Sequence, residues 1–184
     1  MRSSDLTHRI SLQRVTESRD SFGDPVASWS ELGQVWAAIE WAGGGESLQA
    51  DRQYAEVPAA IDVRRSTTTM SVREKDRAMV PAGATKLRSL ISSTSTTMVI
   101  EPDGIFPPEN EFVVRINREL ALVTAGSGTT ASPYTISRGK YGTTPALHKS
   151  GTSVIHMQPL DIVSVTPSRY SMRLQAVRGE VRST

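Results

Sequence analysis

The strongest constraint on the fold is the pattern of residues 6–40, in which two alternating segments flank a turn sequence. In the first segment, His8, Ile10 and Leu12 alternate with Arg9, Ser11 and Gln13; in the second, Val35, Ala37, Ile39 and Trp41 alternate with Trp36, Ala38 and Glu40. A period of two is typical of a half-buried strand. Residues 20–25 supply the Asp, Gly and Pro that favour turns. The stretch predicts a long antiparallel hairpin whose tip is partly anchored by Phe22.

The alternation also assigns the two tryptophans of the second strand to opposite faces. Trp41 shares the more apolar face with Val35 and Ile39, so we expect it to be buried. Trp36 shares its face with Glu40, which favours partial exposure or contact with a neighbouring subunit.

Further short apolar segments predict strands along the rest of the chain. They cover residues 58–65, 72–80, 112–116, 119–124, 134–137, 160–167 and 171–177. Asn117-Arg118 is a suitable two-residue hairpin turn between two of them. Residues 66–71 predict a Thr-rich turn. Only 5% of the 184 residues are aromatic, and Ser, Thr and Gly are plentiful, which favours short strands and many turns. The predicted fold is therefore all-β, with a small antiparallel barrel or sandwich as its core.

Charge and cysteine content exclude several classes of function. The net charge is +2, residues 1–90 and 91–157 are each neutral, and the positive excess lies in residues 158–184. Tight nucleic-acid binding requires a concentrated basic patch, which this distribution does not provide. The absence of cysteine excludes disulfides and Cys-ligated metals. With a polar N-terminus and no apolar run of about 20 residues, we expect a chain that is not secreted, has no membrane partner and is made in the cytoplasm.

The sequence contains no set of residues that predicts catalysis. His8, His148 and His156 are scattered and lack an acidic partner at the spacing of metal ligands, and neither a G-x-S-x-G nor an H-E-x-x-H motif occurs. We expect His148 to have a structural role, such as a hydrogen bond to a turn carbonyl. No catalytic residue, metal or cofactor is predicted, so the protein is not expected to be an enzyme.

The order of motifs in residues 6–40 resembles a known family. Leu6, His8-Arg9-Ile10, Leu12-Gln13-Arg14, Asp20, Phe22 to Val26, Trp29 and Val35 to Glu40 follow the pattern of head-closure (head–tail joining, or stopper) proteins of tailed bacteriophages. The resemblance continues less closely at residues 56–65, where the family's Thr-His pair and Tyr are missing.

The resemblance also implies that the family core is split by an insertion. After residue 80 the family pattern expects a short hairpin, yet its continuation reappears at residues 160–167. We therefore expect a discontinuous core at residues 1–91 plus 158–184 and a second β domain, inserted at a hairpin, at residues 92–157. Residues 92–97 and 157–159 are expected to be the linkers. Within the insert, F-x-[VI]-R-I-x-x-E and R-G-x-x-G-T-T-x-x-x-H resemble a β module recurrent in phage virion proteins.

Residues 42–57 contain three consecutive glycines and a small negative excess, which predict a flexible surface loop followed by a marginal helical turn. The family resemblance instead implies a loop that lines a DNA channel. The candidate residues are Gly43, Gly44, Gly45, Glu46, Gln49, Asp51, Arg52 and Gln53.

The resemblance implies a structural protein of the phage neck, located in the virion. It is expected to form a homomeric ring, as a dodecamer, with Trp36, His8 and Arg9 as candidate interface residues. Its partners would be a portal or adaptor protein above, a tail terminator or tail protein below, and genomic DNA that passes through without sequence specificity.

Two alternatives remain open. One is another phage connector or tail protein, such as an adaptor, a tail terminator or a tail-tube subunit. The other is a β protein that binds carbohydrate or a host surface through its insert.

Overall fold

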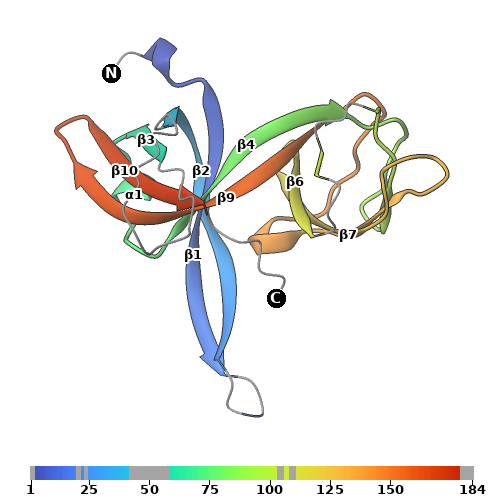
Figure 1. Ribbon diagram of the computed structural model, residues 1–184, viewed down its shortest axis with the longest axis horizontal. Helices are drawn as coiled ribbons and strands as arrows, with labels where there is room; N and C mark the ends of the chain where they lie inside the picture. The colour runs from blue at the N-terminus through green and yellow to red at the C-terminus, as the bar shows by residue number, and fades with distance from the viewer. Residues whose placement is uncertain are drawn as a thin grey trace, which may run out of the picture. The chain divides into compact units, whose positions relative to one another are not determined.

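The computed structural model describes residues 3–19, 22, 25–41, 59–102, 106–107 and 111–178, most of them in β-strands (Figure 1). The strands are β1 (His8–Arg19), β2 (Pro25–Trp41), β3 (Ala59–Arg64), β4 (Arg77–Lys86), β5 (Thr97–Met98), β6 (Phe112–Ile116), β7 (Glu119–Ala125), β8 (Tyr134–Ser137), β9 (Ser153–Pro167) and β10 (Ser171–Arg178). The helices are the 3-10 helices η1 (Ser3–Asp5) and η2 (Lys140–Gly142) and the α-helix α1 (Thr67–Met70). The prediction of an all-β fold is confirmed.

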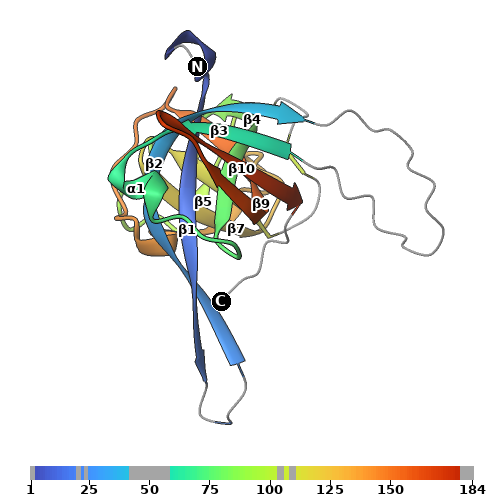
Figure 2. The ribbon, with the colours of Figure 1, turned by 90° about the vertical axis from the view of Figure 1, so that its left-hand side faces the viewer.

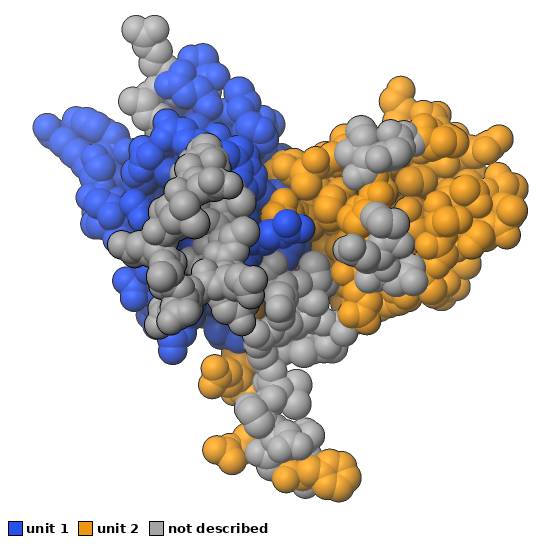
Figure 3. All heavy atoms as spheres, viewed as in Figure 1, with its two compact units in different colours: residues 1–15, 32–80, 159–180 blue, residues 16–31, 81–158, 181–184 orange. Residues whose placement is uncertain are grey.

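The chain divides into two compact units (Figure 3). Unit 1 consists of residues 1–15, 32–80 and 159–180, and unit 2 of residues 16–31, 81–158 and 181–184. Strands β1, β2, β4 and β9 each contribute residues to both units.

Unit 1 is built on a closed ring of antiparallel strands. The strand order is β10-β3-β2-β1-β4-β9, and a further pairing between β10 and β9 closes the ring; Figure 2 shows β2, β3 and β10 side by side. The apolar side chains of these strands share one core: Ile10, Leu12, Ala37, Ala59, Ile61, Val63, Val72, Ala78, Val80, Leu160, Ile162, Met172, Leu174 and Ala176. The alternating positions of β3 and β10 enter this core, as their period of two requires.

The middle of β1 is buried on both faces, which corrects the half-buried pattern expected from its alternation. Ile10 and Leu12 belong to the core, yet Ser11 and Gln13 are also inaccessible to solvent. Gln13 lies opposite Arg77 on β4, and the Arg77 Nε donates a hydrogen bond of 2.7 Å to the Gln13 Oε1. A polar side chain can occupy such a position because a hydrogen bond offsets part of its desolvation.

Residues 66–71, predicted to be a Thr-rich turn, contain the single helical turn α1 between the N-cap Ser66 and the C-cap Ser71. The Ser66 side chain accepts from the Thr69 amide, and the Thr69 hydroxyl is bonded to the Ser66 amide at 2.8 Å, so the two residues form a capping box. Such reciprocal bonds satisfy amides that the first turn of a helix leaves without partners.

The predicted hairpin at residues 112–125 is confirmed in unit 2. Strands β6 and β7 pair in antiparallel register, with Ile116 opposite Glu119, and Asn117 adopts a φ of 57° in the turn between them. Asparagine tolerates this left-handed conformation better than most residues. The predicted strand at residues 134–137 is β8. The core of unit 2 contains Leu87, Ile91, Met98, Ile100, Phe112, Val114, Ile116, Ala121, Val123, Tyr134, Ile136 and Val154.

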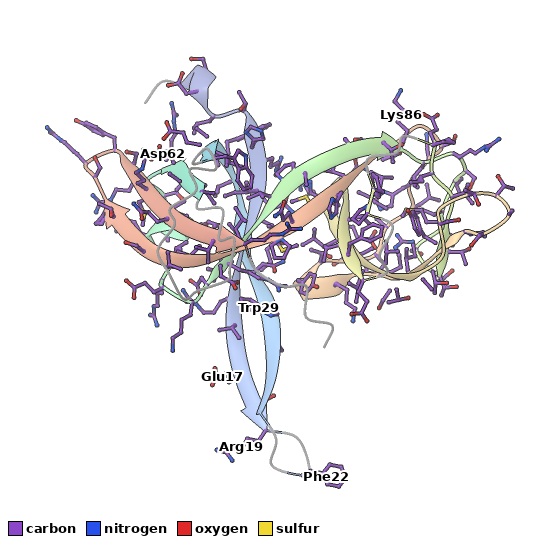
Figure 4. The ribbon with its side chains drawn as sticks, viewed as in Figure 1. Glu17, Arg19, Phe22, Trp29, Asp62 and Lys86 are labelled. Carbon is purple, nitrogen blue, oxygen red and sulfur yellow. The ribbon has the colours of Figure 1, made fainter. Side chains whose placement is uncertain are left out.

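Two regions are more extended than the sequence indicated. Residues 157–159, expected to be a linker, lie inside β9, which pairs with β6 as far as Met157 and with β10 from Leu160. Strand β1 extends to Arg19, and β2 begins at Pro25. Phe22, between them, is 90% exposed (Figure 4). The expectation that Phe22 anchors the hairpin tip is therefore wrong.

Candidate subunit interface

Trp36 lies on an exposed face of unit 1. Its side chain is 53% exposed, whereas its neighbour Ala37 is buried and Val35 packs against the core. The register of β2 against β3, with Ala37 opposite Val63, holds this part of the strand in place. An exposed indole on a rigid strand is a typical anchor for a protein–protein contact.

A shallow groove of about 400 Å³ lies beside Trp36 and is lined by Leu6, Val35, Trp36, Arg64 and Ser66. Besides Val35 and Trp36 of β2, these residues come from three further places that the fold of unit 1 brings together. Leu6 precedes β1, Arg64 ends β3, and Ser66 is the N-cap of α1. The groove therefore combines an apolar floor with one guanidinium group.

His8 and Arg9, the other two predicted interface residues, are each half-buried at the start of β1. The His8 Nδ1 lies 3.0 Å from the hydroxyl of Thr7. Neither residue lines the groove beside Trp36, so the structure does not join the three candidates into one surface.

Trp41 is 47% exposed, so the prediction that it is buried is wrong. Trp41 points to the same side of β2 as the core-facing Ala37. It is the last residue of the strand, however, and lies opposite Ala59, the first residue of β3. Burial at a strand end requires a covering layer, and alternation alone does not supply one. Trp41 instead lines a second groove, together with Glu40, Ala59, Ala60, Val163, Arg173, Gln175, Ala176 and Val177.

The predicted channel loop, residues 43–53, lies outside the residues that the structure describes. Its assignment remains a prediction.

Unit 2 contains a buried charge cluster that sequence reasoning missed. Glu119 accepts two hydrogen bonds from Arg138, from Nε at 2.5 Å and from Nη2 at 2.7 Å, and its Oε2 lies 2.8 Å from the Nε2 of His148. The backbone amides of Gly139 and Ala146 also donate to this carboxylate. The side chains of Glu119, Arg138 and His148 are at most 7% exposed.

The cluster fixes the loop that leads from β8 to β9. Arg138 donates further hydrogen bonds to the carbonyls of Ser92 and Ala146, and the Asn117 Nδ2 lies 3.3 Å from the His148 Nδ1. These contacts agree with the structural role predicted for His148. Its side chain contacts the Glu119 carboxylate, however, and not the turn carbonyl that was expected. Glu119, Arg138 and His148 all occur in the two motifs quoted for the insert, and these motifs were the available signal in the sequence.

Acid should destabilise unit 2 through Glu119. Burial alone would raise the pKa of Glu119, but the hydrogen bonds from Arg138, His148 and Ala146 outweigh it and lower the pKa from 4.5 to about 2. A carboxylate with a depressed folded-state pKa contributes stability above pH 4.5 that is lost as the pH falls toward 2. We expect a loss of about 3 kcal/mol across this window, since one pKa unit corresponds to about 1.4 kcal/mol.

Chemical unfolding of the full chain at pH 7, 4.5, 3 and 2, followed by hydrogen exchange of the β7 and β8 amides, measures this loss. Glu119→Gln, which cannot titrate, should remove that part of the pH dependence. An unchanged acid profile in this variant would assign the loss to other groups.

Among the described residues, no group of three His, Asp or Glu side chains is arranged to hold a metal ion. In the same part of the chain, no helix has the length and apolar character needed to cross a membrane.

Comparison with known protein families gives a match to the N-terminal part of the chain. Residues 1–78 match the family model described as phage head completion protein. Neither curated proteins nor solved structures gave a match. The family match supports a structural virion protein that takes part in phage head–tail joining. Over residues 1–78 this chain is similar to the phage head completion proteins, which confirms the family resemblance found in its sequence.

Proposed function

We propose that this protein is a head-closure protein of the phage neck, which forms a homomeric ring, closes the filled capsid below the portal and adaptor, and provides the docking face for the tail. The observation that carries this proposal is the family match over residues 1–78. Those residues supply β1, β2 and β3, which are half of the strand ring of unit 1, together with the helix α1. The similarity therefore covers a coherent part of the fold rather than an isolated motif.

The surface of unit 1 supports self-association. Ring assembly requires two different patches on each subunit, because each subunit meets its two neighbours through different faces. The described residues of unit 1 line one groove beside Trp36 and a separate one beside Trp41. Because the strands of unit 1 close on themselves, we expect contact through side chains rather than through added strands.

The proposed mechanism is assembly and gating, without catalysis. The chain carries a net charge of only +2, so a channel built from it would attract DNA weakly and let it pass. We assign residues 43–53 to the channel lining as part of this proposal.

Electron microscopy of the purified protein and of tailless capsids tests the proposal. We expect rings with an axial hole in the first sample, and the same ring below the portal in the second. A protein that stays monomeric at high concentration and is missing from the neck would contradict the assignment. If such a monomer bound cell-wall glycans, the host-surface alternative would replace it.

A further inference from the structure

Unit 2 exposes two leucines where the segment after β4 pairs with the segment before β9. Leu90 is 56% exposed and Leu147 is 57% exposed. Each precedes a buried residue of an antiparallel bridge, in which Ile91 and His148 exchange both backbone hydrogen bonds, at 3.0 and 2.9 Å. Because side chains alternate along extended backbone, both leucines lie on the outer side of this bridge. They are diagonal neighbours on one surface of unit 2.

Two cations border the leucines. In the register of the bridge, Lys149 lies opposite Leu90. Arg88 lies two residues before Leu90, and its carbonyl accepts a hydrogen bond of 2.9 Å from the Ser150 hydroxyl of the facing segment. Arg88 and Lys149 are both exposed, and among the described residues no carboxylate pairs with either side chain.

No acidic residue belongs to the two segments that carry these side chains. Residues 84–92 and 145–153 contain neither Asp nor Glu. Glu101, on a neighbouring segment, lies opposite Lys86, the last residue of β4 (Figure 4), and so has a cation of its own. The surface formed by Arg88, Leu90, Leu147 and Lys149, here called the Leu90–Leu147 face, is therefore apolar at its centre and positive at its edge.

The buried charge cluster of unit 2 holds this face in place. Leu147 lies between Ala146, whose amide donates to Glu119 at 3.0 Å, and His148, whose Nε2 lies 2.8 Å from the same carboxylate. Arg138 donates to the Ala146 carbonyl at 2.7 Å. A surface that is already fixed loses little conformational freedom on binding. The cluster has no part in the proposed assembly or gating, and the presentation of this face gives it a role.

The chemistry of the face favours a protein partner that is both acidic and apolar. Carboxylates complement exposed guanidinium and ammonium groups, and a guanidinium binds them in bidentate fashion. The leucines require an apolar side chain, which the phosphate backbone of DNA does not supply. Two leucines also bury too little surface to anchor a protein in a membrane, since even a myristoyl chain binds only marginally. An acidic polypeptide that carries an apolar side chain satisfies both halves of the face.

We propose that the Leu90–Leu147 face is the docking site for an acidic, apolar segment of another virion protein. A large apolar side chain of the partner packs on Leu90 and Leu147, and carboxylates on either side of it meet Arg88 and Lys149. The inference rests on the proposed function for the class of partner, because a neck protein contacts other virion proteins. It assigns to unit 2 a role that the ring and the channel do not include.

Nuclear magnetic resonance of the isotope-labelled full chain tests the site with a defined probe, the peptide acetyl-Asp-Glu-Phe-Asp-Glu-Leu-amide. We expect saturable shifts of the amides of residues 88–92 and 146–150 at millimolar peptide, with weaker binding as salt is added. A peptide with Ser in place of Phe and Leu should bind about 10-fold more weakly. No saturable shift at these residues, or equal binding of the serine peptide, would overturn the proposal.

Charge reversal makes the test specific. The double variant Arg88→Glu, Lys149→Glu should lose the acidic peptide and bind instead a peptide with Lys at each acidic position. The matched control is Arg65→Glu, Arg169→Glu, which makes the same change in net charge at exposed arginines of unit 1 and should bind as the wild type does. Thermal melting of each variant confirms that the chain is folded. An equal loss in the control would assign the binding to net charge alone, against the proposal.

Two further probes test the class of partner. A short DNA duplex and vesicles of phosphatidylglycerol are titrated into the same labelled chain. We expect neither to displace the acidic peptide from the Leu90–Leu147 face. Tighter binding of the duplex or of the vesicles at the same amides would replace the protein partner by DNA or by a membrane surface and overturn the proposal.

Phage particles separate this inference from the proposed function. Particles assembled with the double variant Leu90→Ser, Leu147→Ser should keep the protein in the neck and lose infectivity. Full infectivity of these particles would overturn the docking site and retain the neck assignment. Peptide binding by a protein that electron microscopy does not find in the neck would retain the docking site and overturn the proposed function.

Discussion

Glu119→Ala should lower the free energy of unfolding of unit 2 by about 3–5 kcal/mol, the range typical when one partner of a buried ion pair is removed. Without this carboxylate, the Arg138 guanidinium, 7% exposed, loses the acceptor of two hydrogen bonds. The amides of Gly139 and Ala146 also lose their acceptor. Because little water reaches the Arg138 guanidinium, its desolvation penalty remains. Urea unfolding, with hydrogen exchange of the β7 and β8 amides to locate the change, measures the loss.

Glu101→Ala is the matched control for this variant. Glu101 also belongs to unit 2, but its side chain is exposed, and the contact it makes with Thr85 uses its backbone carbonyl. The control should change the free energy of unfolding by less than about 0.5 kcal/mol. A loss of under 1 kcal/mol in Glu119→Ala would mean that the loop from β8 to β9 does not depend on the cluster.

The second large effect is expected in unit 1, where Asp76→Ala should cost about 2–3 kcal/mol, a typical value for charged hydrogen bonds with little solvent access. Asp76 is 4% exposed and accepts from the Arg14 Nε at 3.1 Å, from the Arg14 Nη2 at 2.8 Å and from the Arg73 amide at 2.8 Å. Arg14 also donates to the Ser71 carbonyl. These contacts join β1 to the turn that precedes β4, in which Lys75 has a φ of 75°.

Asp62→Ala supplies the comparison, because Asp62 also pairs with an arginine of unit 1. Its partner Arg173 is 45% exposed and bonds both Asp62 and Glu40. Exposed ion pairs contribute between about 0 and 1 kcal/mol, so this variant should unfold almost as the wild type does. If the two variants lose equal stability in thermal and urea unfolding, burial does not determine the strength of the Asp76 contacts.

The sequence by itself determined the elements whose cause is local. The short apolar segments at residues 112–116 and 119–124 predicted β6 and β7, and Asn117-Arg118 predicted their turn, because strand preference and turn geometry depend on neighbouring residues alone. The order of motifs in residues 6–40 predicted a resemblance to phage head-closure proteins, and the match of residues 1–78 to the phage head completion family model confirms that resemblance. The all-β class followed from the same local patterns.

Only the tertiary structure decided which faces are covered. Ser11 and Gln13 lie on the polar face of β1 by pattern, yet both are buried, whereas Trp41 lies on the apolar face and is exposed. Burial depends on what packs above a strand, and alternation describes the strand alone.

The structure also decided which distant charges meet. Glu119 lies 19 residues from Arg138 and 29 from His148, and their contact depends on the pairing of β7 with β8 and on the path of the following loop. No local pattern specifies such a contact. The low pKa of Glu119 and its contribution to stability arise only when the fold brings these side chains together and removes them from water.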